Sequence, residues 1–220
     1  MSLAVVRSRA PAAGRAPDVT VEVHLANGLP SFSIVGLPDL EVRESRERVR
    51  AALSNCGFDF PVRRITVNLA PADLPKESGR FDLPIALGIL AASGQIPAAA
   101  LTDWREFAGE LSLTGAVRPM RGAFAMACGT ARAHAHSQSL SAATEPHDRT
   151  DADVHTSCTP QLYLPADNAT EAALVPDVDV YAVTDLRALC AHLAGAEDAR
   201  LAPVRARALD TVPAGALPDM

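Results

Sequence analysis

Apolar and polar residues alternate in the N-terminal part of the chain, and this alternation predicts β-strands. Residues 19–25 place valine or leucine at every second position, and residues 65–69 repeat the pattern. A turn signal at residues 27–30 is followed by apolar residues at 32–35, which predicts an N-terminal hairpin. The short apolar stretch at residues 3–7 is typical of an edge strand.

Helical spacing replaces this alternation in two segments on either side of the 65–69 strand. Asp39 can cap a helix that runs to about residue 55, and Asp82 can cap a second helix that is apolar nearly all round. The stripe that the first helix should bury consists of Val42, Ser45, Val49, Ala52 and Leu53. Residues 71–79 carry prolines, a glycine and charges, which predict a loop. Because this loop connects a core strand to a buried helix, it is the first place to look for function.

The second half of the chain mixes short strands and helices. The pattern predicts a hairpin over residues 107–120, helices over 123–133, 168–174 and 185–193, and strands over 162–164 and 178–183. The mixed order indicates an α/β (α+β) domain with a mixed sheet and helices in layers.

Composition sets two segments apart from this domain, which we place at residues 1–195. Residues 134–160 are dominated by Ser, Thr, His, Asp and Ala, so they bury too little apolar surface to offset the entropy of ordering. We expect them to form a disordered insertion. Residues 196–220 are rich in Ala, Pro and Arg and are typical of a tail or linker.

Charge and cysteine usage narrow the class of protein. The net charge of −6 argues against a protein that coats nucleic acid without selectivity. No apolar run is long enough to span a bilayer, and the N-terminus lacks a secretory signal. The four cysteines are scattered, which favours a reduced, cytoplasmic protein over a disulfide scaffold. Because no apolar run spans a bilayer, we expect no membrane partner.

Lysine chemistry depends on one residue, because Lys76 is the only lysine. It stands outside any G-x-x-x-x-G-K-[ST] motif, so this chain should not hydrolyse ATP by P-loop chemistry. Lys76 and Ser78 are close enough in sequence for a Ser-Lys dyad, which needs a lysine of depressed pKa. Asp73, Glu77 and Arg80 surround Lys76 in sequence, so we interpret it as a solvated loop lysine and keep the dyad as the weaker alternative.

Metal and nucleic-acid binding find weaker support. Candidate metal ligands gather in one polar segment, as His134, His136, His147, His155 and Cys158. Their spacing is irregular, so we favour a polar insertion without metal. His24, on the wet face of its strand, and His192, near a helix C-terminus, are expected to face solvent or to be stabilised by the helix dipole. The arginines of the 39–55 helix alternate with glutamates, which is typical of a solvated face. A small basic patch is better predicted from Arg63, Arg64 and Arg80, which bracket the central strand and its loop.

Several longer motifs resemble one known family. They are Thr20-Val-Glu-Val-His, Gly28-Leu-Pro, Val35-Gly-Leu-Pro, Arg48-Val-Arg, Ile65-Thr-Val-Asn-Leu-Ala-Pro-Ala-Asp-Leu-Pro-Lys-Glu, Asp82-Leu-Pro-Ile-Ala and Gly109-Glu-Leu-Ser-Leu-Thr-Gly. The family is that of the Mg-chelatase-like AAA+ proteins, which includes the competence protein ComM, and the resemblance is to its N-terminal domain. It covers residues 1–133 and 162–195.

This resemblance implies a fold like the Lon protease domain. It also implies that family members continue into an AAA+ ATPase module, bind ATP and Mg²⁺ there, and act as hexameric helicases that drive DNA branch migration in natural transformation. We expect the chain to be an isolated or truncated N-terminal domain, without a cofactor of its own. Its expected partners are an AAA+ module or full-length homologue and single-stranded or branched DNA.

The resemblance to Lon also implies that peptidase chemistry is lost. Residues 80–82 occupy the region of the Lon nucleophile, and Ser78 falls short of it; Phe124 stands about where the catalytic lysine would be. We therefore expect a non-catalytic domain whose contact residues are Arg63, Arg64, Lys76 and Arg80. Two alternatives remain, a divergent Lon-like peptidase that uses Ser78 and Lys76 and, ranked last, a magnesium-chelatase subunit.

Overall fold

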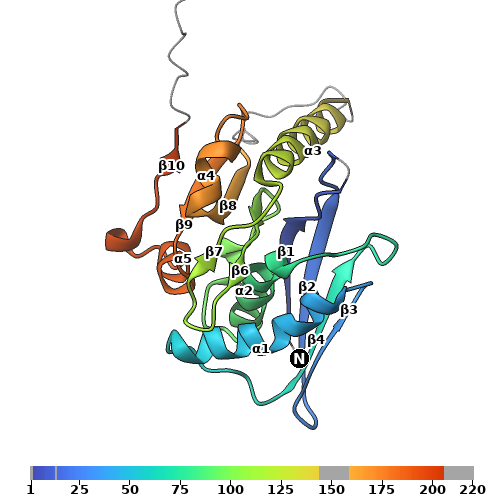
Figure 1. Cartoon of the computed structure of the whole chain (residues 1–220), viewed down its shortest axis with the longest axis vertical. Coiled ribbons are helices and arrows are strands. Elements are labelled where there is room, and N and C mark those ends of the chain that lie inside the picture. Colours follow the sequence, from blue (N-terminus) through green and yellow to red (C-terminus); the bar gives the residue numbers. More distant parts are fainter. Residues whose placement is uncertain (1, 13, 144–158, 206–220) are drawn as a thin grey trace, which may run out of the picture.

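A computed structural model describes residues 2–12, 14–143 and 159–205. Its centre is an eight-stranded mixed sheet with strand order β10-β9-β8-β5-β1-β2-β4-β3 (Figure 1). The strands are β1 (Ser2–Arg9), β2 (Asp18–Ala26), β3 (Ser31–Val35), β4 (Arg64–Ala70), β5 (Arg105–Phe107), β8 (Gln161–Pro165), β9 (Asp179–Val183) and β10 (Pro203–Val204). A separate hairpin pairs β6 (Glu110–Leu111) with β7 (Val117–Arg118). The predicted mixed α/β fold is confirmed.

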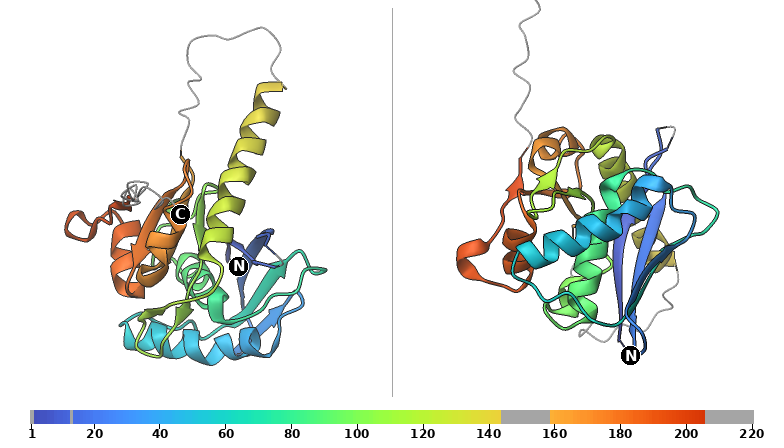
Figure 2. Two further views of the ribbon diagram at one scale, coloured as in Figure 1. Left: turned by 45° about the horizontal axis from the view of Figure 1, so that its top comes forward. Right: turned by 60° about the horizontal axis from the view of Figure 1, so that its bottom comes forward.

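Five α-helices of the described ranges cover this sheet unevenly. They are α1 (Leu40–Asn55), α2 (Asp82–Ala92), α3 (Ala123–Ala143), α4 (Ala166–Ala172) and α5 (Leu186–Leu193). One hydrophobic cluster joins α1, α2 and α5 to one face of the sheet, and a second joins α3 and α4 to the other face of β8 and β9. Figure 2 shows α1 and α2 by the N-terminal strands and α3 and α4 by the C-terminal ones. Among the described residues, the second cluster takes no member from β2, β3 or β4, so no described helix covers that face of the N-terminal strands.

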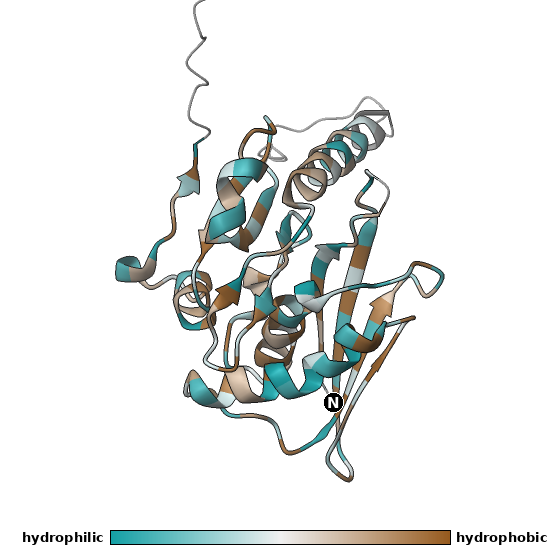
Figure 3. Cartoon of the chain, in the orientation of Figure 1, coloured by the Kyte–Doolittle hydropathy of each residue, from teal (hydrophilic) through white to brown (hydrophobic). Residues whose placement is uncertain are grey.

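The helices follow from local sequence. Asp39 caps α1 by accepting a hydrogen bond from the Val42 amide at 2.7 Å, and the predicted stripe of α1 is buried as expected. Every residue of α2 is buried, which matches its apolar sequence. Hydropathy on the ribbon shows the contrast, with α1 mixed and α2 mostly apolar (Figure 3). No helix within the described ranges is long and apolar enough to cross a membrane.

Strand pairing corrects two predictions. β1 is an inner strand between β5 and β2, not an edge strand. β2 and β3 do not form a hairpin, because β4 lies between them, antiparallel to β2 and parallel to β3. The turn signal at residues 27–30 is a real change of direction, but a local signal cannot show that a later strand enters between its two arms.

Two segments are more ordered than predicted. The α3 helix continues through residues 134–143, so the predicted start of the disordered segment at residue 134 is too early. Composition did not show that the alanine, glutamine and serine residues there can extend an existing helix. Residues 144–158 lie outside the described part of the chain. Beyond residue 195, a short 3₁₀ helix, η3 (Glu197–Ala199), is followed by β10, which pairs with β9. Residues 206–220 are not described.

Candidate functional site

The β4–α2 loop (residues 71–78) is held against the turn between β3 and α1. The Lys76 amide donates to the Leu37 carbonyl at 3.4 Å, and the Asp39 amide donates to the Lys76 carbonyl at 3.1 Å. The Asp39 carboxylate, which caps α1 with Oδ1, also accepts a hydrogen bond from the Ser78 amide at 3.2 Å with Oδ2. One carboxylate therefore fixes both the start of the helix and the end of the loop.

Lys76 is fully buried, and the prediction of a solvated lysine is wrong. Its ammonium donates a hydrogen bond to the Pro71 carbonyl. Burial lowers the pKa of Lys76, and the nearby Asp73 carboxylate partly opposes this shift. The sequence showed charged neighbours but not the backbone bonds that fold the loop over the lysine. Lys76 is therefore part of the interior and not of the surface.

Arg80 is buried as well, in the 3₁₀ helix η1 (Gly79–Phe81) that follows the loop. Its guanidinium donates to the Ser78 hydroxyl at 2.9 Å, the Glu77 carbonyl at 3.2 Å and the Arg121 carbonyl at 3.3 Å. Burial lowers the pKa of Arg80, while Glu77 and Asp39 raise it. Within the described residues it forms no ion pair, so its role in this conformation is to tie the loop to the segment before α3.

The two members of the candidate dyad have different partners. The Ser78 hydroxyl accepts from Arg80, whereas the Lys76 ammonium donates to a backbone carbonyl. Across the described ranges, no hydrogen bond joins Ser78 to Lys76. Phe124, in the first turn of α3, is half exposed, and its amide donates to the Glu171 carboxylate at 3.1 Å.

A buried ion pair beside the loop was missed by sequence reasoning. Asp82, expected to cap α2, is instead its first residue, and its carboxylate is fully buried. It accepts hydrogen bonds from Arg48 Nε at 2.6 Å, from the Leu111 amide at 3.1 Å and from the Ser45 hydroxyl. Burial raises the pKa of Asp82 against the opposing effect of these bonds, and the bond to Asp82 raises the pKa of Arg48. Ser45 within an otherwise apolar stripe was the signal for a buried polar partner.

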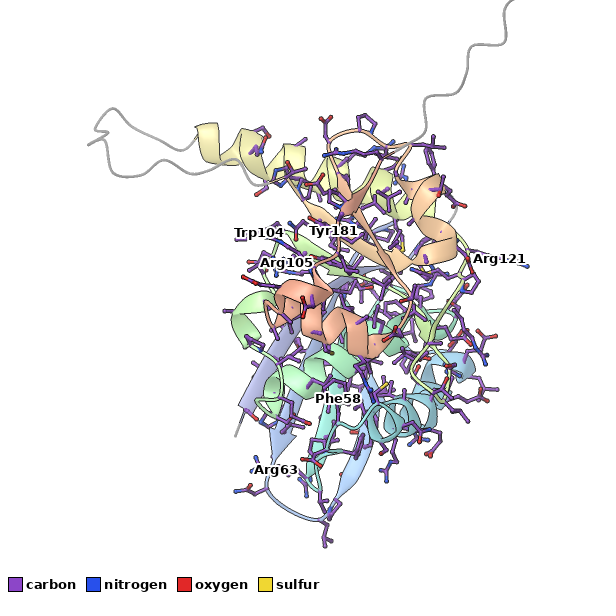
Figure 4. The ribbon with its side chains drawn as sticks, turned by 90° about the vertical axis from the view of Figure 1, so that its left-hand side faces the viewer. Phe58, Arg63, Trp104, Arg105, Arg121 and Tyr181 are labelled. Atoms are coloured by element: carbon purple, nitrogen blue, oxygen red, sulfur yellow. The ribbon has the colours of Figure 1, made fainter. Side chains whose placement is uncertain are left out.

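The structure does not bring the predicted contact residues into one patch. Arg63 and Arg64 are exposed where β4 begins, and Figure 4 shows Arg63 at that end of the strands, away from Arg121. Lys76 and Arg80 are buried beyond the other end of β4. A seven-residue strand separates the two pairs by about 20 Å.

The histidines show no grouping within the described part of the chain. No cluster of three or more potential metal ligands is found there. His134 and His136 lie on α3, while His147, His155 and Cys158 fall outside the described residues. His192 lies half-buried in the last turn of α5, where its Nδ1 accepts from the Leu201 amide at 3.1 Å and its Nε2 lies 3.2 Å from the Tyr163 hydroxyl.

Comparison with known proteins places these features in context. Residues 21–144 match the protein family described as Subunit ChlI of Mg-chelatase. Competence protein ComM of Haemophilus influenzae is 45% identical over 202 residues, which cover 92% of this chain and 35% of ComM. An uncharacterized protein YifB of Salmonella typhimurium is 43% identical over 195 residues, covering 89% and 33% of the two chains. The chain thus spans about a third of the length of these relatives.

Proposed function

This chain belongs to the Mg-chelatase-like family that includes ComM, and on that premise we propose that it is a non-catalytic module for assembly or DNA engagement. The machine it serves would be a ComM-like AAA+ ATPase that drives DNA branch migration in recombination and natural transformation. ATP and Mg²⁺ would bind only in the AAA+ module. The expected partners are that module or a full-length homologue within a hexamer, and single-stranded or branched DNA, in the cytoplasm.

The partners of the side chains in the β4–α2 loop support the proposal that this domain is not catalytic. A Ser-Lys dyad needs the neutral amine beside the hydroxyl whose proton it takes. Here the loop directs Lys76 to the Pro71 carbonyl and Ser78 to Arg80. Both groups therefore stabilise the loop, which in turn supports the α1 cap through Asp39.

Two exposed arginines that form no ion pair with described residues support the proposed contact with DNA. Arg63 and Arg64 face solvent and form no ion pair in the described part of the chain, so both are free to meet phosphate. Lys76 and Arg80 remain proposed contacts only if the loop opens, because both are buried in this conformation.

Fluorescence anisotropy with a labelled four-way DNA junction and with single-stranded DNA tests DNA engagement. We expect salt-sensitive binding by the natural chain and weaker binding by an Arg63→Ala/Arg64→Ala variant, with a smaller salt slope. An Arg121→Ala/Arg132→Ala variant removes the same charge elsewhere and should bind normally. The proposal fails if the natural chain binds neither DNA nor a ComM-like AAA+ module in a pull-down experiment.

The divergent Lon-like peptidase remains the second candidate, because burial lowers the pKa of Lys76 in the direction that a dyad needs. It predicts peptide cleavage that a Lys76→Ala variant abolishes. Absence of cleavage, or cleavage unchanged in that variant, removes it. A magnesium-chelatase subunit role rests on the family name alone and ranks last.

A further inference from the structure

Exposed apolar side chains gather at the two ends of strand β3. Five of the eleven large apolar side chains that the described residues expose lie there. Leu29 and Val62 are 83% and 81% exposed at its start, and Val35, Leu37 and Leu40 are 46%, 55% and 72% exposed at its end. Such a concentration marks an interaction surface, since single exposed apolar residues are normally scattered.

β3 is also an edge of the sheet, and it is on the right in Figure 1. The Ser31 amide bonds to the Arg63 carbonyl, so by strand alternation the backbone groups of Phe32 and Ile34 point to the open edge. Arg46 covers the Phe32 carbonyl through a long 3.4 Å bond, which a better donor can displace. Natural edges are usually protected more firmly than this.

The end of β3 carries backbone strain. Leu37 has a φ of 58°, in the left-handed region that a leucine seldom adopts. Its side chain is half exposed, so this backbone conformation does not serve to bury it. Its carbonyl is fixed by the bond from the Lys76 amide. Strain that holds an apolar side chain out of the core is typical of positions with a binding role.

The two ends of the strand differ in charge. The start, which we call the basic end, has exposed Arg63 and Arg64 beside Leu29 and Val62. The finish, which we call the acidic end, adds exposed Glu41 and Glu77 to Val35, Leu37 and Leu40. Over the described ranges, none of these four charged side chains forms an ion pair. Arg43 also faces solvent near the acidic end, so apolar contact must supply most of any affinity.

We propose that β3 pairs antiparallel with β3 of a second copy of this chain about a two-fold axis. Such pairing sets the basic end of each copy against the acidic end of the other, so apolar groups meet apolar groups and arginines meet glutamates twice. Centred on Ser33, it opposes Phe32 of one copy to Ile34 of the other and satisfies their edge-facing backbone groups. The inference goes beyond the hexamer of the proposed function, because a two-fold contact joins two chains and does not close a ring of six. It therefore concerns how this domain pairs with a second copy, and it does not concern the contacts around a ring.

Nucleic acid is the alternative partner for this surface. Phosphate would use Arg63 and Arg64, but it would be repelled by Glu41 and Glu77 at the acidic end. Only a second copy uses both ends, and for this reason we favour it.

Sedimentation equilibrium over a wide range of protein concentrations tests the pairing directly. The natural chain should form a reversible species of twice the 23.0 kDa of one chain. Arg63→Glu/Arg64→Glu and Glu41→Arg/Glu77→Arg variants should each dimerise at least about tenfold more weakly, because like charges then face each other at both contacts. An Arg121→Glu/Arg132→Glu variant makes the same charge change far from β3 and should dimerise normally.

Mixing the two β3 variants provides the decisive result. In a mixed dimer, both reversed contacts become attractive again, so the mixture should recover a species of two chains although neither variant dimerises alone. Amide hydrogen exchange of Phe32 and Ile34 should slow as the natural chain dimerises. A natural chain that stays monomeric, a mixture that does not associate, or a closed species of more than two chains would each overturn the proposal.

The same variants separate this inference from DNA binding. Glu41→Arg/Glu77→Arg keeps both arginines, so this variant should be monomeric and still bind the DNA junction. If the natural chain dimerises as described but binds no DNA, the DNA role fails and the pairing stands. If it binds DNA as a monomer at every concentration, the pairing fails and the DNA role stands.

Discussion

The two halves of the sheet share one surface but differ in what covers it. One row of residues crosses the sheet on this surface: Val180, Leu162, Glu106, Arg7, Thr20 and Ala70. The first three are buried under α3 and α4 or in ion pairs, and the last three are only half-buried. β8 is consequently buried on both faces, whereas β2 alternates between buried and half-buried positions from Val19 to Ala26.

This difference explains which strands could be predicted from the hydrophobic pattern of the sequence. A strand with one wet face shows the two-residue alternation that predicted β2 and β4. A strand covered on both faces reads as a continuous apolar run, and only its flanking residues identify it. The difference also implies that a single layer of described helices stabilises the N-terminal half of the sheet. The hydrogen bonds and ion pairs within that layer should therefore contribute strongly to the free energy of unfolding.

Removing the buried carboxylate of that layer should have the largest effect. In Asp82→Ala, the Ser45 hydroxyl and the Leu111 amide lose the carboxylate that accepts from them, and Arg48 loses its buried ion-pair partner. We expect a loss of about 3 to 5 kcal/mol in the free energy of unfolding, measured by urea denaturation. Asp82→Asn keeps the shape and should lose less. A loss below about 1 kcal/mol, as for an exposed pair, would show that α1 does not depend on this tie.

Truncating a covered side chain in the other half should come next. Leu164 is fully buried in the second cluster, so Leu164→Ala leaves a cavity and should lower the free energy of unfolding by about 2 to 5 kcal/mol. Thermal and urea unfolding should agree on the loss. A near-neutral result would mean that α3 and α4 do not pack tightly on β8.

Acid should weaken the covered half through His192 on α5. Burial and the nearby Arg105 and Arg200 lower the pKa of His192, and its Nδ1 must be unprotonated to accept from Leu201. Its contribution is complete above the unfolded-state pKa, near 6.5, and is lost as the pH falls through the lower folded-state pKa. Urea unfolding should therefore show a free energy of unfolding that falls between about pH 7 and about pH 5, the range in which histidine titrates. His192→Gln should make this free energy less dependent on pH.

The smallest effect is expected on the bare surface. Thr66 faces outward on β4 and is half-buried, with no helix over it in the second cluster. Thr66→Ala should change the free energy of unfolding by less than about 0.5 kcal/mol. A larger loss in a concentration-dependent manner would indicate that a partner covers this surface.

The candidate site was only partly predictable. The β4–α2 loop was located correctly between its strand and helix because prolines, glycine and charges interrupt two apolar patterns. The burial of Lys76 and Arg80 was not predictable, since it arises from contacts with residue 37 and residue 121, which are distant in sequence. The partners of Asp82 were equally hidden, because Arg48 and Leu111 approach it from separate elements.

The sequence by itself determined most of the elements up to residue 195, the apolar stripe of α1, the all-round burial of α2 and the family. These are local or additive properties, set by periodicity, capping and motif identity. Tertiary structure alone decided that β4 enters between β2 and β3, that no described helix covers one face of the N-terminal strands, and that the loop cations are buried. Each of these depends on which distant residues meet, and pairing between distant segments leaves no trace in local periodicity.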